Sequence, residues 1–547
     1  MHPSLFLKVP MPTPAHFIFE NARVFTANPA HPTAEAVAVT HNRITFVGSR
    51  AEALAFKGPG TRVIDANGGT LLPGFIDSHF HMLYGALNLD GMQLEPASSY
   101  EELSQIILDY AAEHPADAWL PGTGLRYNLG PGHTPLNRHH LDALVADRPI
   151  YLNAFDGHTS WANTLALKMA GIFNGGECGP NSENVLDEHG ESTGELREPG
   201  AYQPVSDLVP KPDAVRKRAL LQKALRLTAS LGVTSVHNMD GDDQRAATYA
   251  ALEDLGELTC RIYLPYTVSP DTTPETLKKD VLALKNTYNS DLLRAGAVKF
   301  FIDGVIEGFT GLLVDPYADN PSTCGAANYD LEQFNLLVAE ADRLGMQIFT
   351  HSVGDMGVRR VLDAYQRAQK HNGRRDSRHR IEHIELVHPQ DLARFKELGV
   401  LASMQPLHSP MVVDKNDIWP VRVGRERWPL SFAWQTLREA GAMLIFGSDW
   451  PVVTQNPLRG VCNAVTRLPW EEGMPHQRQT LTDTLIAYTR DAAYGEFQEH
   501  QKGQIRAGYL ADLVLLPQDI FAIPPAEIAS LKPALTMADG RIVHEAL

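Results

Sequence analysis

Cysteine is scarce in this chain of 547 residues. The four cysteines stand at positions 178, 260, 324 and 462, and no two of them form a CxxC pair. This spacing argues against a disulfide framework and a zinc ribbon, and it favours reduced thiols in a cytoplasm. Long apolar runs are also missing: none approaches the ~18 residues needed to cross a bilayer. The N-terminal stretch MHPSLFLKVPMPTP is interrupted by Lys8 and Pro10. We therefore predict a cytoplasmic protein with no signal peptide and no membrane partner.

Positive charge is in short supply as well. The chain has 48 Lys and Arg against 65 Asp and Glu, which gives a formal net charge of -17. Binding to nucleic acid requires a basic face, so a nucleic-acid partner is not expected. The remaining composition, with 44% hydrophobic and 21% charged residues, is that of a globular protein long enough for more than one domain.

Both ends of the chain have the alternating pattern of half-buried strands. HFIFENARVFTAN and AEAVAVTHNRITFVGS lie near the N-terminus, and GYLADLVLLP and ALTMADGRIVHEAL lie near the C-terminus. Apolar and polar residues alternate in each, with turn residues between them. Chain termini often lie close together in a domain. We predict one small β-sandwich domain built from residues 16–72 and 503–547.

The middle of the chain, residues 73–502, alternates apolar runs with helical stretches. Eight runs read as strands: 74–81, 232–239, 260–268, 297–304, 346–355, 380–387, 399–406 and 442–451. Repeated strand–helix units predict a parallel sheet, and eight strands are the number that closes a (β/α)8 TIM barrel. Two further strand-like runs, AWLPGTGL and PIYLNAFDGH, fall in residues 90–215. We predict that this segment is an insertion after the first barrel strand, forming a lid or subdomain over the barrel mouth.

Groups that can bind a metal recur where the predicted barrel strands end. The six candidates are His79, His81, Lys299, His351, His383 and Asp449. Side chains two residues apart on a strand point the same way, so the histidines of SHFHM share one face. The carboxyl ends of barrel strands converge on one mouth. Imidazole and carboxylate ligands suit Zn²⁺, with Mn²⁺, Fe²⁺ or Co²⁺ as substitutes. We therefore predict a metal centre at the mouth.

Each of these residues also has a plainer interpretation. His351 alone could be a loop histidine that bonds a carbonyl, and Asp449 alone could cap a turn before Pro451. Lys299 is the least expected, because a buried ammonium group is costly. It extends toward solvent, pairs with Asp303, or is chemically modified. The recurrence of such groups at successive strand ends favours the metal site over separate coincidences.

The motifs PGFIDSHFH, THSVGD, RIEHIEL, FGSDWP and GYLADLVLL, with the lysine of the fourth strand, resemble the amidohydrolase superfamily. The nearest likeness is to its branch that includes N-substituted formamide deformylases. The resemblance implies two Zn²⁺ ions per chain, bridged by Lys299 carboxylated on its side-chain nitrogen. It implies further that His79, His81 and Asp449 bind the more buried ion, and that His351 and His383 bind the second. An unmodified lysine would favour a single-metal site.

The reaction expected from this resemblance is hydrolysis of a C–N amide bond in an N-substituted formamide or N-acyl compound. Metal-bound hydroxide would attack the carbonyl carbon, and Asp449 would carry a proton to the leaving amine. The same chemistry would serve a hydrolase of a cyclic amide, ester or lactone, or a deaminase. An alternative from another class is a non-catalytic regulatory or ligand-binding barrel. The expected partner is a small-molecule amide, and large barrels of this family often pair, which suggests a homodimer.

Four residues are candidates for substrate contact. Arg126, His158 and Trp161 lie in the predicted insertion, and His237 ends the strand GVTSVHNM. A surface ion pair for Arg126 and a subdomain core for Trp161 are equally good interpretations. His158 is favoured, because members of the resembled family carry a histidine at this place. Glu382, beside a candidate ligand, is expected to orient a ligand rather than react.

Overall fold

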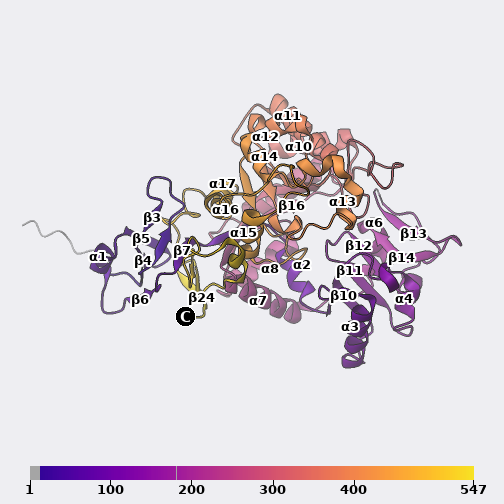
Figure 1. Cartoon of the computed structure of the whole chain (residues 1–547), viewed down its shortest axis with the longest axis horizontal. Helices are drawn as coiled ribbons and strands as arrows, with labels where there is room; N and C mark the ends of the chain where they lie inside the picture. The colour runs from indigo at the N-terminus through magenta and orange to yellow at the C-terminus, as the bar shows by residue number, and fades with distance from the viewer. Residues whose placement is uncertain (1–12, 180) are drawn as a thin grey trace, which may run out of the picture.

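The computed structural model describes residues 13–179 and 181–547, so the interpretation of the first twelve residues lies outside the described chain. Three parts follow one another along the long axis of the molecule (Figure 1). A β-rich part built from both termini lies at one end, the barrel lies in the middle, and the inserted segment lies at the other end. None of the helices in these residues is long and apolar enough to cross a membrane.

The barrel consists of eight parallel strands, and each coincides with a strand predicted from the sequence. In spatial order they are β8 (Phe75–Phe80), β15 (Val233–Asn238), β16 (Arg261–Thr267), β17 (Leu293–Phe301), β18 (Gln347–Ser352), β19 (Arg380–His383), β20 (Leu401–Met404) and β21 (Leu444–Phe446). A β-bridge between Phe80 and Trp450 joins the last strand region to the first. The predicted (β/α)8 barrel is confirmed.

Helices cover the outside of the barrel because each has one apolar face. In α11 (Asp355–Asn372), the buried residues Val358, Val361, Leu362 and Tyr365 recur at helical spacing. The other connecting helices include α7 (Ala214–Ser230), α8 (Asp243–Asp254), α9 (Pro274–Thr287), α10 (Leu331–Arg343), α12 (Leu392–Leu398), α14 (Trp434–Glu439), α15 (Pro457–Thr466), α16 (Leu481–Ala487) and α17 (Arg490–Tyr494). Each barrel strand has one face against the helices and the other toward the barrel interior. Both faces are buried, so the strands are almost continuously apolar.

The terminal β domain has two sheets, as the alternating patterns predict. One has the order β5 (Arg43–Gly48), β4 (Ala36–Thr40), β1 (Phe17–Glu20), β6 (Arg62–Asp65). The other has the order β24 (Arg541–Glu545), β23 (Leu535–Ala538), β22 (Leu513–Leu516), β7 (Thr70–Pro73), β2 (Arg23–Phe25), β3 (Thr33–Ala34). Strand β22 pairs with β7, so both chain ends contribute to one sheet. Phe19, Val37, Leu71 and Leu513 share the core of this domain.

The inserted segment forms a six-stranded sheet of its own. Its order is β13 (Glu183–Leu186), β14 (Ser192–Arg197), β12 (Thr159–Ala162), β11 (Ile150–Ala154), β10 (Leu120–Leu125), β9 (Met92–Gln93). The helices α3 (Tyr100–Glu113), α4 (Arg138–Asp142), α5 (Thr164–Met169) and α6 (Pro199–Ser206) accompany it. Leu103 and Ile107 of α3 pack against Leu152 of β11 in a separate core. These elements fall within the predicted insertion, residues 90–215.

A buried ion pair joins the barrel to the terminal β domain. Arg261, at the start of β16, donates two hydrogen bonds to the Asp512 carboxylate, at 2.7 and 3.1 Å. The same guanidinium reaches Asp539 at 2.9 Å. Both Arg261 and Asp512 are buried. A buried charge of this kind is tolerated only while its partner is present.

We therefore expect Asp512→Ala to lower the free energy of unfolding by about 3–5 kcal/mol, because it leaves the Arg261 guanidinium without its bidentate partner. Asp207→Ala, which breaks the exposed Lys211–Asp207 pair, should cost under about 1 kcal/mol. Urea denaturation of both variants measures the difference. Equal losses in the two variants would contradict a structural role for the buried pair.

Candidate metal centre

The ends of β8, β19 and β21 bring three candidate ligands together. One ligand atom from each of His79, His383 and Asp449 lies within 4.8 Å of the others. The Asp449 Oδ1 atom is 3.3 Å from Nε2 of His79 and 3.2 Å from Nε2 of His81. The ring of His351 is 4.4 Å from that of His383, between centroids. Residues far apart in sequence therefore meet at the carboxyl ends of the barrel strands.

Each of the four imidazoles has one ring nitrogen held by an oxygen acceptor. Nδ1 of His79 faces Glu382 at 2.7 Å, and Nδ1 of His81 faces Asp240 at 3.0 Å. Nδ1 of His383 faces the side-chain oxygen of Gln405 at 2.8 Å, and Nε2 of His351 faces the carbonyl of Gly304 at 3.1 Å. With a proton on these nitrogens, the neutral rings of His79, His351 and His383 have a free lone pair on the opposite nitrogen. The ring of His81 has to lose a proton before it can bind a metal, because Asp240 and Asp449 favour its charged form. Metal-binding histidines are oriented in this way by their outer partners.

The protonation states suit a metal as well. Burial lowers the pKa of His79 to about 4 and holds the pKa values of His351 and His383 well below the usual value. Burial opposes ionisation of Asp449, but the imidazoles of His79 and His81 hold its pKa far below normal. Neutral imidazoles and an ionised carboxylate are the forms that ligate metal. At His81, burial is outweighed by Asp240 and Asp449, which raise its pKa to about 9.

The backbone is strained at the ligand positions. His383, Ile384 and Asp449 have φ angles of 74°, 49° and 65°. Non-glycine residues rarely adopt this region, and each instance costs on the order of 1–3 kcal/mol. The surrounding contacts fix these turns: the N–H of Asp449 donates to the carbonyl of His79 at 2.7 Å, and the N–H of Ile384 donates to Ser352 at 3.0 Å. The strained turns thus direct two candidate ligands out of their strands into the mouth.

Lys299 lies on β17, fully buried beneath the centre. Its Nζ has no hydrogen-bond partner among the described residues and lies 4.6 Å from the centroid of the Phe301 ring. The alternative of pairing with Asp303 is wrong, because Nζ makes no contact with that carboxylate among the described residues. Asp303 instead accepts the backbone N–H groups of Leu312, Val353 and Gly354. Burial lowers the pKa of Lys299 to about 8. A buried amine without a partner is unusual and points to a ligand or a modification.

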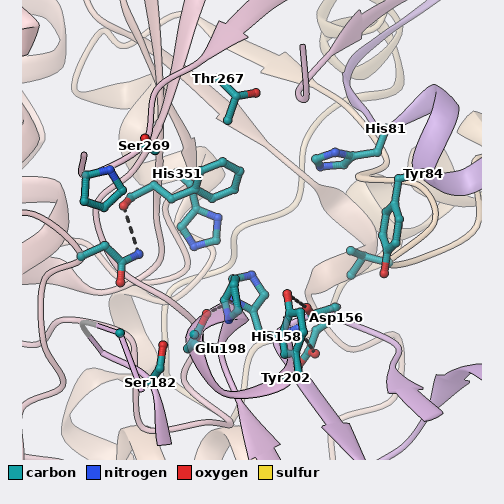
Figure 2. A pocket seen from close by; sticks show the side chains of 18 of the residues that line it. His81, Tyr84, Asp156, His158, Ser182, Glu198, Tyr202, Thr267, Ser269 and His351 are labelled. Carbon is teal, nitrogen blue, oxygen red and sulfur yellow. Dashed lines mark hydrogen bonds and ion pairs between the residues drawn. The ribbon is translucent and has the colours of Figure 1, made fainter. Parts of the chain in front are cut away.

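A cavity of about 750 Å³ opens above these residues and is roofed by the inserted segment. His158 enters it from the insertion, and its Nδ1 is 2.9 Å from the Glu198 carboxylate. Glu198 also accepts a hydrogen bond from Thr310 at 2.7 Å. Figure 2 shows His158, Glu198 and Tyr202 on one side of the cavity and His81 on another. The insertion therefore supplies part of the site.

The comparison with known proteins agrees with this geometry. The model of the Amidohydrolase family matches residues 62–544. The chain belongs to the amidohydrolase family. This membership supports hydrolase activity with a metal cofactor, in agreement with the cluster of His79, His383 and Asp449.

Relatives of this amidohydrolase align over nearly the whole chain. Protein LONG AFTER FAR-RED 3 of Arabidopsis thaliana is 32% identical over 519 residues, which cover 92% of this chain and 87% of the relative. The N-substituted formamide deformylase of Arthrobacter pascens is 25% identical, with 96% and 97% covered. The crystal structure of an uncharacterized metal-dependent hydrolase from Pyrococcus furiosus superposes with a TM-score of 0.71 at 25% identity, covering 93% of this chain and 99% of that one.

Of the four predicted substrate contacts in this amidohydrolase, His158 alone lines the large cavity. Trp161 is 2% exposed and packs in the core of the insertion, 5.5 Å from the Tyr127 ring. Arg126 is exposed and lines a different cavity of about 630 Å³. His237 is fully buried within the barrel. Sequence periodicity placed these residues near strand ends but could not tell the mouth from a core.

One residue near the centre was missed at the sequence level. His408 follows β20 in MQPLHSP, and its Nε2 lies 3.5 Å from Oδ2 of Asp449. Its ring stacks on that of His383, with centroids 5.5 Å apart and an angle of 7° between planes. The signal was available, because β20 is the barrel strand between those that supply His383 and Asp449. His408 is the last residue of a short helical turn, Pro406–His408, and therefore does not stand at the strand end where the sequence pattern would indicate it.

His237 belongs to a buried network below the mouth. Arg380 donates to its Nδ1 at 2.7 Å, and its Nε2 lies 3.2 Å from Glu496. A donor on Nδ1 fixes the neutral form of the ring with its proton on Nε2. Burial lowers the pKa of His237 to about 4. Since the unfolded pKa is about 6.5, protonation favours the unfolded chain.

Stability should therefore fall as the pH decreases from about 6.5 to 4, with His237 contributing up to about 3 kcal/mol of the loss. The stabilisation from a lowered histidine pKa is complete above the unfolded value and disappears toward the folded value. His237→Gln keeps an acceptor and a donor but cannot titrate, so its urea-denaturation midpoints should depend less on pH. The exposed His500→Gln is the control. Identical pH slopes for His237→Gln and the parent would contradict this assignment.

Proposed function

We propose that this amidohydrolase cleaves the C–N bond of a small amide, of the N-substituted formamide or N-acyl type. The observation that carries the proposal is the set of four imidazoles around Asp449, each with one nitrogen held by an oxygen acceptor. The relative named as an N-substituted formamide deformylase, aligned over 96% of this chain, supports the choice of bond. The product would be a carboxylic acid and an amine.

The residues present fit divalent metal. His79 Nε2 and Asp449 Oδ1 are buried without a hydrogen-bond partner among the described residues, which is the condition of ligands awaiting an ion. In our proposal His79, His81 and Asp449 hold one Zn²⁺, and His351 and His383 hold a second. Nitrogen and carboxylate donors suit zinc, although other divalent metals are compatible. When bound, such ions activate water and polarise the amide carbonyl.

Lys299 would bridge the two ions after reaction with CO₂. The unprotonated Nζ attacks the carbon of CO₂, an N–C bond forms, and the nitrogen loses a proton. A lowered pKa near 8 makes the reactive amine accessible near neutral pH. The product is an anionic group with two oxygens, which removes the cost of burying an ammonium ion.

Asp449 would move the proton. Its carboxylate is buried and ionised, so it can accept a proton from the attacking water and pass it to the leaving amine nitrogen. His158 would hold the substrate: its Nδ1 is fixed by Glu198, and its Nε2 has no hydrogen-bond partner in the described part of the chain. Burial opposes charging of His158, but Glu198 raises its pKa to about 9, so the ring can donate to an amide oxygen.

The remaining predictions on partners and location stay proposals. We expect a small-molecule amide as substrate, with no nucleic-acid or membrane partner. A homodimer and a cytoplasmic location complete the proposal.

Asp449→Asn should retain metal but lose turnover by about 10²–10⁴-fold, because the amide oxygen can still ligate while the proton acceptor is gone. Metal analysis and a substrate panel of formamides, N-acyl compounds and lactones measure both effects. His79→Ala is the matched variant, and it should lose metal and activity together.

Retained turnover in Asp449→Asn would remove this residue from proton transfer, and full metal content in His79→Ala would reject the ligand assignment. Turnover of lactones alone would favour the ester alternative. A metal-loaded parent that turns over no member of the panel would favour a non-catalytic barrel.

Lys299→Met should lower the metal content by about half or more and abolish most activity, since thioether cannot be carboxylated. The apolar side chain of similar length keeps the buried site filled. In the parent loaded with ¹³C-bicarbonate, a carbamate signal should appear by NMR and be absent from the variant. Lys279→Met, on the exposed face of α9, is the control. Unchanged metal content and activity in Lys299→Met would contradict the bridging role.

A further inference from the structure

The positive charge in the cavity above the candidate metal centre is confined to imidazoles that already have carboxylate partners: His81 with Asp240 and Asp449, and His158 with Glu198. Among the described residues that line its 750 Å³, none is Lys or Arg. Its carboxylates are Asp156, Glu198, Asp271 and Asp449. Glu198 is paired with His158, whereas Asp271 is exposed at the rim. A substrate group that enters this space therefore finds acceptors and negative charge, and no guanidinium or ammonium to neutralise an anion.

A second, smaller cavity of about 250 Å³ touches the same centre from another side. It shares His351, His383 and Asp449 with the large cavity. Within the described chain, its lining also contains neither Lys nor Arg, while Glu385, Asp414 and Asp417 are present. The two halves of an amide bound at Asp449 can extend into these two cavities. Both cavities thus have carboxylates and no lysine or arginine in their described linings.

The remainder of the large cavity is aromatic. Tyr84, Tyr151, Tyr202, Phe301 and Tyr329 contribute to its lining. Figure 2 shows Tyr84 and Tyr202 on the wall around the open space. Aromatic faces attract apolar groups and cations, and they give no stabilisation to a carboxylate. No unpaired cation among the described lining residues would compensate the desolvation of an anion here.

Two arginines without a partner in the described part of the chain line a different cavity. Arg126 and Arg459 are exposed and line the outer cavity of about 630 Å³. That cavity contains none of the six candidate metal residues. These arginines could bind the carboxylate of a substrate that reaches the centre from the outer cavity. Substitution of Arg126 therefore tests that alternative separately.

From this distribution of charge we infer that the substrate is an amide without a carboxylate, neutral or positively charged, and that anionic N-acyl amino acids are rejected. The inference rests on the proposed amide hydrolysis and deepens it. Rejection comes from the carboxylates of the lining, because the described lining has no lysine or arginine and its charged imidazoles are already paired; this is selection by repulsion. Specificity is thereby set in the cavity walls rather than at the metal ligands.

Matched substrates test this inference. N-formylphenylalanine and its carboxamide differ only in one negative charge on the amine half, and N-butylsuccinamic acid and N-butylsuccinamide differ likewise on the acyl half. With the Zn²⁺- and bicarbonate-loaded full chain, kcat/KM should be at least about 100-fold higher for the neutral member of a pair that is cleaved. Equal or faster cleavage of the anionic member overturns the inference and leaves amide hydrolysis intact.

Two charge-reversal variants sharpen the test. Asp271→Lys places a cation at the cavity rim and should raise kcat/KM for the anionic member by about tenfold. Asp254→Lys makes the same change in net charge on exposed α8, away from the cavity, and should have no effect. Equal effects of the two variants would contradict selection by the cavity. If the anionic member is cleaved well and Arg126→Gln removes that activity, the carboxylate sits in the outer cavity and the inference is wrong.

Failure of the proposed function gives a different result. If no member of either pair is cleaved, amide hydrolysis loses its support, and calorimetric binding to the metal-loaded chain decides the charge question. Binding of a neutral member at least about tenfold tighter than its anionic partner supports the inference. Equal binding, tighter binding of the anion, or no measurable binding of either overturns it.

Discussion

A buried network of charged side chains supports the whole site. Arg380 and Glu382 are both fully buried on β19, and Glu382 connects the guanidinium to Nδ1 of His79 on β8. The same Arg380 donates to His237 on β15, to the carbonyl of Ser78, and to Ser403 on β20 at 2.9 Å. Four strands are thereby tied together across the barrel interior. Since a buried charge must be fully paired, this network fixes where His79 stands before any metal is considered.

The barrel above that network brings the candidate ligands together at one mouth. Parallel strands deliver their carboxyl ends to one mouth, and positive φ angles at His383 and Asp449 turn the ligands inward. The insertion then closes the mouth and adds His158 with its partner Glu198. The terminal β domain lies at the other end of the long axis, away from the insertion (Figure 1). One end of the barrel is therefore anchored to the terminal β domain through Arg261 and Asp512, and the other end carries the candidate site.

Predictions from the sequence succeeded where local pattern and global fold coincide. All eight barrel strands were recognised because strands buried on both faces read as apolar runs bounded by helices. The terminal domain was recognised from period-two alternation. The same reasoning failed for Trp161, which periodicity alone could not assign to a core rather than a wall, and for His408, which ends a helical turn after its strand. It also allowed a Lys299–Asp303 pair, whereas Asp303 accepts three backbone N–H groups and Lys299 has no partner among the described residues.

What the sequence by itself determined is the barrel, its flanking domain and the identity of the metal-competent groups, because hydrophobic periodicity and strand-end position are local properties. Only the tertiary structure decided which nitrogen of each histidine faces an acceptor and that Lys299 has no partner among the described residues. It also decided that the described walls around Asp449 contain neither lysine nor arginine. These depend on contacts between residues hundreds of positions apart, such as His79 with Glu382. Their physical cause is burial: away from water, each polar group must find its partner in the fold, and no local pattern specifies which one.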